Sequence, residues 1–458
     1  MLPDVALLEI FDSYVGDTYE KQAWHTLVHV CRKWRYVVFG SPRRLNLRLV
    51  CGGTTPAREM LNVWPLLPII LSVNSFFPTG DVGNILAALE HNDRICQMVI
   101  LDVPSSGTEK VLAALQQPFP ALTSLHFAFP YQKENVPVVP ASFLGGSAPA
   151  LQTLIMSRIP FPGIPELLSS ATHLVDLSLW EIPHSGYFSP EAMVTALSVL
   201  TRLECLIIYF DIPRSRPDQN SRRPPPQTRT LLPVLTRLTF NGAVEYLEDL
   251  VVQVDAPLLD RLEIDYLYEP IFDTLRLTQF ISRTPTLREH DEARVKFYDY
   301  FASVKLPRTF YGSIRLGISC IESDLQLSSV AQVCSSTFPP ALILTVERLY
   351  IDIYCERLWE DDIEESQWIE LFRPFVAVKD LYISSDFTPQ IATALQELGE
   401  SATEVLPALE MLFFEEPLPS GPVQEAFGEF VATRQLAGHP IAISPWRKEE
   451  DDYETDYD

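Results

Sequence analysis

The sequence predicts an α/β solenoid in which a short strand and a helix recur along most of the chain. The first observation is a repeated pattern, apolar-x-x-apolar-x-apolar, whose alternating apolar residues are typical of a half-buried strand. Where the pattern is clear, successive copies start 23 to 32 residues apart. The copies begin at Ile95, Leu122, Leu151, Leu174, Leu203, Leu235, Leu259, Val346, Val378 and Leu409.

The second observation is that amphipathic helical stretches such as GNILAALEHN and PQIATALQELGE separate the copies. One strand and one helix per repeat is the unit of a leucine-rich-repeat solenoid, in which stacked units bury a continuous core. The pattern weakens between residues 265 and 345, and the eighth position after each first apolar residue lacks the Asn or Cys of a regular repeat. We therefore expect an irregular leucine-rich-repeat-like curved solenoid over residues 46–440. The alternative is an ordinary α/β domain whose strands look alike.

The first 45 residues predict a separate helical domain. In residues 2–15, Pro3 stands at the start of a helix, where its missing N–H costs nothing. Apolar residues then follow at helical spacing. A second helix is predicted because apolar residues recur at steps of three and four, namely Leu27, Val30, Cys31, Trp34, Val37 and Val38. Its basic residues lie on the other side, as on the wet flank of an amphipathic helix.

These two stretches resemble the F-box. The residues that carry the resemblance are Leu-Pro, then Leu-Leu-x-Ile-Phe, then Val-Cys-Arg-x-Trp-Arg. The chain is similar to the F-box proteins with degenerate repeats that are abundant in mushroom-forming fungi. The resemblance implies a three-helix F-box over residues 1–45 that docks on the Skp adaptor and, through it, the cullin scaffold of an SCF ubiquitin ligase. It implies that the adaptor-binding residues are Leu2, Pro3, Leu7, Leu8, Ile10, Phe11, Val30, Cys31 and Trp34.

The repeats would then hold a protein substrate. The three recurring apolar residues of each strand point inward, so the alternate residues line the opposite, concave face. Tryptophan, tyrosine and arginine dominate interface energetics. The candidate substrate-binding residues are Trp180, Tyr209, Arg237, Arg261, Arg348, Tyr350, Tyr382 and Phe413. The alternative is that packed loops bury many of them.

Composition and motifs argue against other classes of protein. The net charge of −25 disfavours binding to nucleic acid or to an anionic membrane. Phosphate-binding glycine loops and nucleophile motifs are missing from the sequence, so we expect no catalytic residues and no cofactor. His25, His29 and Cys31 lie close together, but no second ligand pair follows, so we expect no metal. Seven scattered cysteines fit reduced thiols in the cytoplasm or nucleus.

Two segments fall outside the repeats. Residues 211–233 are rich in proline and arginine, which is typical of a solvated loop or of a motif for a proline-binding module. Residues 441–458 predict an acidic disordered tail. The sequence thus favours a non-catalytic substrate adaptor of a ubiquitin ligase. The alternative is a ligase-independent interaction scaffold whose N-terminal helices cap the solenoid.

Overall fold

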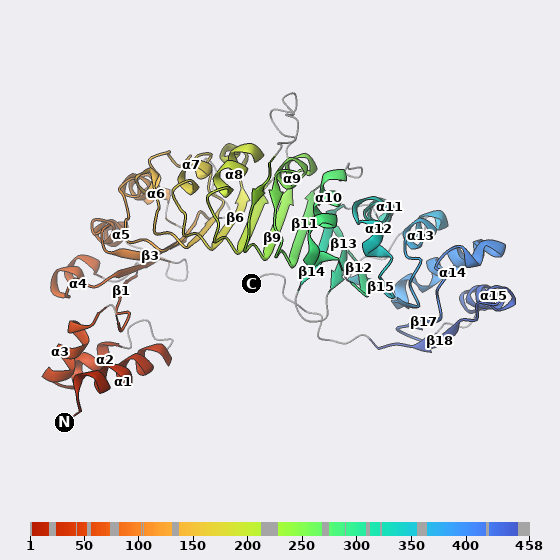
Figure 1. The fold of residues 1–458 in the computed structure, drawn as a ribbon, viewed down its shortest axis with the longest axis horizontal. Coiled ribbons are helices and arrows are strands. Elements are labelled where there is room, and N and C mark those ends of the chain that lie inside the picture. The colour runs from red at the N-terminus through yellow and green to blue at the C-terminus, as the bar shows by residue number, and fades with distance from the viewer. Residues whose placement is uncertain are drawn as a thin grey trace. The chain divides into compact units, whose positions relative to one another are not determined.

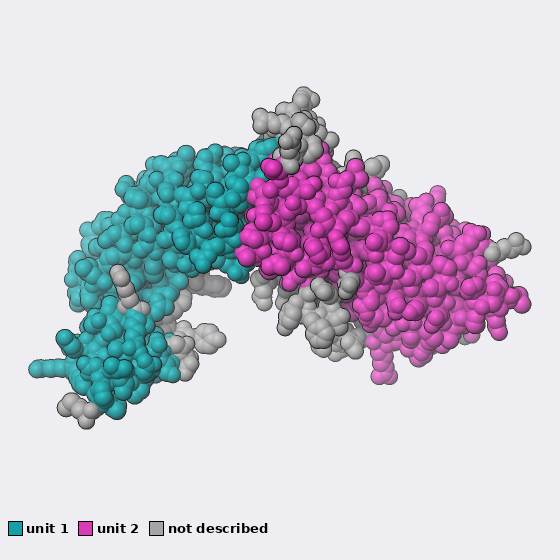
Figure 2. All heavy atoms as spheres, viewed as in Figure 1, with its two compact units in different colours: residues 1–211 teal, residues 212–458 magenta. Residues whose placement is uncertain are grey.

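The chain divides into two compact units, Met1–Asp211 and Ile212–Asp458 (Figure 2). The computed structural model describes residues 2–17, 24–42, 44–52, 56–73, 82–101, 103, 105–130, 137–211, 228–267, 274–288, 290–307, 312–320, 323–354, 364–417 and 421–447. Within this part of the chain, no helix is both long enough and apolar enough to cross a lipid bilayer.

Three short helices begin the first unit: α1 (Asp4–Asp17), α2 (Trp24–Val30) and α3 (Arg32–Gly40). The prediction of one continuous second helix is wrong, because Cys31 has extended backbone angles, φ −159° and ψ 169°, and interrupts it. The Cys31 Sγ accepts a hydrogen bond from the Trp34 N–H at 3.5 Å and so caps α3. As a result Val30 and Cys31, which a continuous helix would turn inward, are exposed.

The rest of the first unit is a parallel sheet with strands in chain order. Its strands are β1 (Leu49–Cys51), β2 (Ile69–Val73), β3 (Ile95–Leu101), β4 (Ser124–Ala128), β5 (Thr153–Ser157), β6 (Asp176–Ile182) and β7 (Cys205–Phe210). Its helices are α4 (Ala57–Val63), α5 (Val82–Leu89), α6 (Ser105–Ala114), α7 (Ile164–Leu168) and α8 (Pro190–Leu197). Helices α5 to α8 line one face of these strands (Figure 1). The recurring apolar residues are buried, as Leu177 and Leu179 illustrate at 0% and 1% exposure.

The second unit repeats this design with one interruption. Its strands are β9 (Arg237–Gly242), β11 (Arg261–Leu267), β12 (Glu292–Tyr298), β13 (Phe301–Pro307), β14 (Ser313–Ser319), β15 (Arg348–Tyr354), β16 (Asp380–Ile383), β17 (Met411–Phe414) and β18 (Ala442–Pro445). Its helices are α9 (Val244–Val251), α10 (Leu275–Arg283), α11 (Ser323–Gln332), α12 (Pro340–Ile343), α13 (Glu365–Phe372), α14 (Thr388–Glu397) and α15 (Pro422–Leu436). A separate pair joins β8 (Thr230–Leu231) to β10 (Val254–Asp255).

The interruption lies where the sequence pattern weakens. The spatial order there is β11-β14-β13-β12-β15, and β13 runs antiparallel to both of its neighbours. Every other strand pair recorded for the main sheet of this unit is parallel. All ten predicted copies form strands, which begin at or two residues after the predicted position. An α/β solenoid built from strand–helix repeats is therefore confirmed, with an inserted antiparallel strand.

Two predicted boundaries change. The tail was expected to begin at residue 441, but Ala442–Pro445 forms β18 and pairs with β17, so the sheet extends past the predicted end of the solenoid. Most of the Pro/Arg-rich segment, residues 212–227, lies outside the described residues, as do residues 448–458. The end of that segment forms strand β8.

Two arginine side chains donate hydrogen bonds to backbone carbonyls next to the strands of the preceding repeat. Arg158 Nε donates to the carbonyl of Phe129 at 2.7 Å. Arg94 Nε donates to the carbonyl of Leu67 at 3.0 Å. Each of these bonds links one repeat to the preceding one, so guanidinium–carbonyl contacts add to the strand pairing between neighbouring repeats.

Arg434 is the most buried of these arginines, at 0% exposure. It donates from α15 to the carbonyls of Ala402 at 2.8 Å and Pro407 at 3.1 Å. Arg434→Ala leaves these carbonyls without donors, and each such loss costs about 1–3 kcal/mol. We expect local unfolding of α15 to become easier by about 3 kcal/mol, measured by hydrogen exchange of its amides. The exposed Arg447→Ala is the control, and equal exchange in the two variants would contradict this role.

Candidate protein-interaction surfaces

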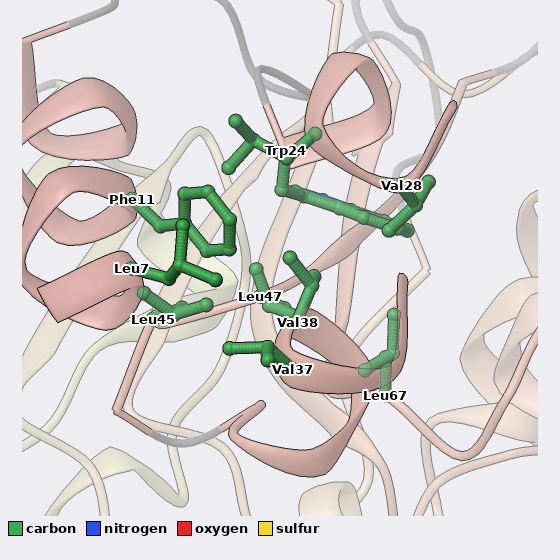
Figure 3. Close-up of a cluster of buried hydrophobic side chains, with 10 residues drawn as sticks. Leu7, Phe11, Trp24, Val28, Val37, Val38, Leu45, Leu47 and Leu67 are labelled. Carbon is green, nitrogen blue, oxygen red and sulfur yellow. The ribbon is translucent and has the colours of Figure 1, made fainter. Parts of the chain in front are cut away.

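The N-terminal helices enclose a small apolar core (Figure 3). Its buried members are Leu7, Phe11, Trp24, Leu27, Val28, Val37, Val38, Leu45, Leu47 and Leu67. The rings of Phe11 and Trp34 meet edge to face, with centroids 4.8 Å apart. The core therefore includes residues beyond position 45, since the chain leading into the first repeats completes it.

The core divides the predicted adaptor-binding residues into two groups. Leu7 is 3% exposed and Phe11 is fully buried, so both pack inside the helical cluster. Leu8 and Trp34 are half-buried. The exposed members are Leu2, Pro3, Ile10, Val30 and Cys31. Leu2, Ile10 and Val30 are 53%, 50% and 55% exposed, which is high for apolar side chains of this size.

Four of the exposed residues gather where α1 begins and α2 passes into α3. Lys33, in the first turn of α3, donates from Nζ to the carbonyl of Leu2 at 2.8 Å and forms an ion pair with Asp4 at 3.1 Å. The start of α1 is thus tied to the start of α3, which Val30 and Cys31 directly precede. We name Leu2, Pro3, Val30 and Cys31 the apolar corner.

The helical cluster also contacts the first repeats. Trp24 donates from its indole nitrogen to the carbonyl of Arg48 at 3.0 Å. The His25 ring stacks on Trp64, with centroids 4.7 Å apart and planes 8° apart. Burial, with His29 nearby, lowers the pKa of His25 from its ordinary value. His25 is thus a packed aromatic residue, and the described residues hold no group of three or more metal-ligating side chains.

The second surface is the strand face opposite the helices in the second unit. Tyr350, Tyr382 and Phe413 occupy paired positions on β15, β16 and β17. Their rings stack, with centroids 4.1 Å and 4.4 Å apart and planes within 9°. Burial, with Glu292 and Tyr382 nearby, raises the pKa of Tyr350 above its ordinary value. We name these three residues the aromatic ladder; all three are half-buried.

Charged side chains continue this face. Arg348 pairs with Asp291 at 2.7 Å and Glu292 at 3.4 Å. Arg237 and Arg261 both approach Glu263, at 3.7 Å and 2.5 Å. Of the eight predicted substrate residues, six therefore lie on the strand face of the second unit. The other two, Trp180 and Tyr209, lie together in the first unit with ring centroids 5.0 Å apart. All eight side chains are half-buried. This lies between the two expectations, which were an open concave face and burial under packed loops.

The sequence prediction missed Trp446, Arg294, Lys305 and Arg315 on this face. Trp446 follows β18, and its ring packs edge-on against Tyr382 at 5.4 Å and Tyr350 at 5.8 Å. It was missed because residues 441–458 carry no repeat pattern. The three basic residues lie on or beside the inserted strand β13, in the part of the chain where the repeat pattern weakens. The alternation in RVKFYDYFASVKLP could have indicated Arg294 and Lys305, and the weak repeat copy YGSIRL could have indicated Arg315.

The surroundings of Glu263 lead us to expect that the free energy of unfolding depends on pH. Burial alone would raise the pKa of Glu263, but its hydrogen bond to Arg261 and the charges of Arg261, Arg315 and Arg237 bring that pKa below the ordinary value. A carboxylate with a lowered folded-state pKa contributes stability that is present above its unfolded pKa of about 4.3 and is lost as pH falls through the folded value.

Glu263→Gln should therefore lower the free energy of unfolding by about 2 kcal/mol at pH 7, since three arginines lose their shared partner. The difference from the unchanged chain should shrink as the pH approaches 4 and below. Urea unfolding at pH 7 and pH 4 measures both values, with the exposed Glu416→Gln as the control. A difference that does not vary with pH would contradict the lowered pKa.

Comparison with known proteins adds little to these observations. No family model and no curated protein matches the sequence. Among solved structures, the chain is similar to the leucine-rich repeat-containing protein LegL7 from Legionella pneumophila. The identity is 9%, the match covers 84% of this chain and 97% of that chain, and the TM-score is 0.27. A TM-score this low carries no argument, so the assignment to an α/β solenoid rests on the chain's own strands and helices.

Proposed function

We propose that the chain is a substrate-recognition adaptor of an SCF-type ubiquitin ligase that works in the cytoplasm or nucleus. The N-terminal helices dock on the Skp adaptor, which joins the chain to a cullin scaffold, and the strand face holds a protein substrate. The chain itself is not an enzyme in this proposal, because ubiquitin transfer belongs to the partners. The observation that carries the proposal is the apolar corner, whose four residues are all part of the motif that resembles the F-box.

The physical argument is one of unpartnered apolar surface. Three short helices cannot bury all of the apolar residues in LPDVALLEIF, and the core takes Leu7 and Phe11. Leu2, Val30 and Ile10 stay at least half exposed. A cluster of exposed apolar side chains costs solubility unless a partner covers it. Docking on a partner protein would remove that surface from water.

A second candidate function has an observation of its own. The contacts of Trp24 with Arg48 and of His25 with Trp64 attach the helices to the first repeats. These contacts are what a cap on a solenoid requires, because a terminal repeat must shield its apolar end. In this alternative the chain is a ligase-independent interaction scaffold. The two candidates differ in what happens when the apolar corner is changed.

The test replaces Leu2 and Pro3 together, as Leu2→Asp and Pro3→Ala. If the corner docks the adaptor, its affinity for the Skp adaptor should fall at least about 30-fold, since two central contact residues are lost. The thermal transition of the repeats should stay unchanged. Leu258→Asp is the matched control, because Leu258 is 51% exposed and Leu2 is 53% exposed. Unfolding of the whole double variant would instead favour the capping role.

A further inference from the structure

The strand face of the second unit carries a row of basic side chains to which the proposed function gives no role. Strand pairing places Arg315, Lys305 and Arg294 side by side on β14, β13 and β12, and Arg294 is paired in turn with Tyr350 on β15. Paired residues on adjacent strands point to the same face of a sheet, about 4.8 Å apart. We name Arg315, Lys305 and Arg294 the basic row; it leads directly into the aromatic ladder.

The basic row and the ladder are in contact. The guanidinium of Arg294 lies over the Tyr350 ring, 5.0 Å from its centroid. Arg294 also pairs with Glu292 at 2.5 Å, and Arg315 pairs with Asp265 at 3.1 Å. The basic row thus places three cationic side chains at paired positions on adjacent strands, beside the aromatic ladder.

The last residues that the structure describes reach this surface. The Trp446 N–H donates to the carbonyl of Phe414 at 2.7 Å, which fixes the backbone beside β17. From there the indole extends back over Tyr382 and Tyr350. The described chain then stops at Arg447. The residues that follow thus start from a point already attached to the aromatic ladder.

The charge and the length of those residues fit the basic row. Seven of the eleven residues in 448–458 are carboxylates: Glu449, Glu450, Asp451, Asp452, Glu454, Asp456 and Asp458. Eleven residues extend to about 36 Å. From β17 to β14 there are five strand spacings, about 24 Å in all. The segment is therefore long enough to lie along the ladder and reach the whole basic row.

We propose that the acidic segment 448–458 binds intramolecularly along the basic row, with Trp446 as its anchor on the aromatic ladder. The segment then occupies the surface that an acidic partner protein would need, so it acts as a competing internal ligand. This inference does not depend on the adaptor role of the N-terminal helices. A short tether gives an effective concentration in the millimolar range, so a contact with a dissociation constant of about 100 µM would be mostly formed.

The test uses a labelled synthetic peptide with the sequence of residues 448–458, and the chain shortened after Arg447. Fluorescence anisotropy at low salt should show that the peptide binds the shortened chain and binds the full chain at least about tenfold more weakly, because the internal segment already fills the site. Binding to the shortened chain should fall steeply at high salt. A control peptide with Gln and Asn in place of its acids should not bind.

Two variants of the shortened chain, Lys305→Glu and Lys305→Met, link binding to the basic row. Both should weaken the peptide at least about tenfold, and the charge reversal should have the larger effect. In the full chain, Trp446→Ala should restore peptide binding towards that of the shortened chain. Equal binding to the shortened and full chains, or no binding to the shortened chain at millimolar peptide, would overturn the proposal. Concentration-dependent dimers of the full chain would show that the segment binds another copy instead.

Discussion

Phe11→Ala should unfold the N-terminal helices at temperatures where the repeats stay folded. Phe11 is fully buried and contacts Trp34 edge to face. Removing a buried phenylalanine side chain costs about 3–5 kcal/mol, and a three-helix cluster has little more stability than that. Hydrogen exchange should show loss of protection in Asp4–Asp17 with unchanged protection in the strands.

Ile10→Ala is the matched control, because Ile10 is the adjacent residue on the same helix and is 50% exposed. It should cost under about 1 kcal/mol, as surface changes usually do. The two variants separate a structural role from a binding role. Phe11 stabilises the helical cluster from inside, whereas the exposed Ile10 can contribute only by contacting a partner protein. Equal protection in the two variants would mean that the described core is not what stabilises these helices.

The double change Tyr350→Ala and Tyr382→Ala should remove substrate capture while adaptor binding stays unchanged. The two rings stack at 4.1 Å in the middle of the aromatic ladder, and Trp446 packs on both. Central aromatic contacts in an interface are worth about 2–4 kcal/mol each. Proteins captured by the tagged chain, quantified by mass spectrometry, should fall at least about 30-fold.

The control is Tyr350→Phe with Tyr382→Phe, which keeps the stacked rings and should keep most of the capture. A different result would place the substrate site on another part of the chain. If capture survives the alanine changes and fails when residues 212–227 are deleted, the Pro/Arg-rich segment holds the substrate and the strand face does not. The two outcomes cannot be confused, because each variant leaves the other segment intact.

The repeat strands could be predicted from the sequence because their apolar pattern directly reports burial. Residues such as Leu174, Leu177 and Leu179 are buried because they lie on the side of the repeat that packs against the helices. The inserted strand β13 could not be predicted in the same way. Its turn from β12 is Asp299 and Tyr300, which lacks the glycine or asparagine that usually marks a two-residue hairpin.

The site was predictable only in part, for similar physical reasons. The period of apolar residues continues through Cys31, and cysteine is not among the usual helix caps, so the break between α2 and α3 left no signal. The aromatic ladder was predictable because Tyr350 and Tyr382 occupy equivalent positions in two repeats. Trp446 could not be predicted, because its contact with these tyrosines depends on strand β18, and no repeat pattern in the sequence indicates that strand.

The most direct test of the adaptor role is co-expression of the full chain with the Skp adaptor and cullin, followed by size-exclusion chromatography with light scattering. The account predicts one stable complex that holds one copy of the 51.9 kDa chain and one copy of each partner. The Leu2→Asp and Pro3→Ala double variant should elute apart from them. A folded, unchanged chain that elutes alone at micromolar concentrations of all three proteins would contradict the adaptor role.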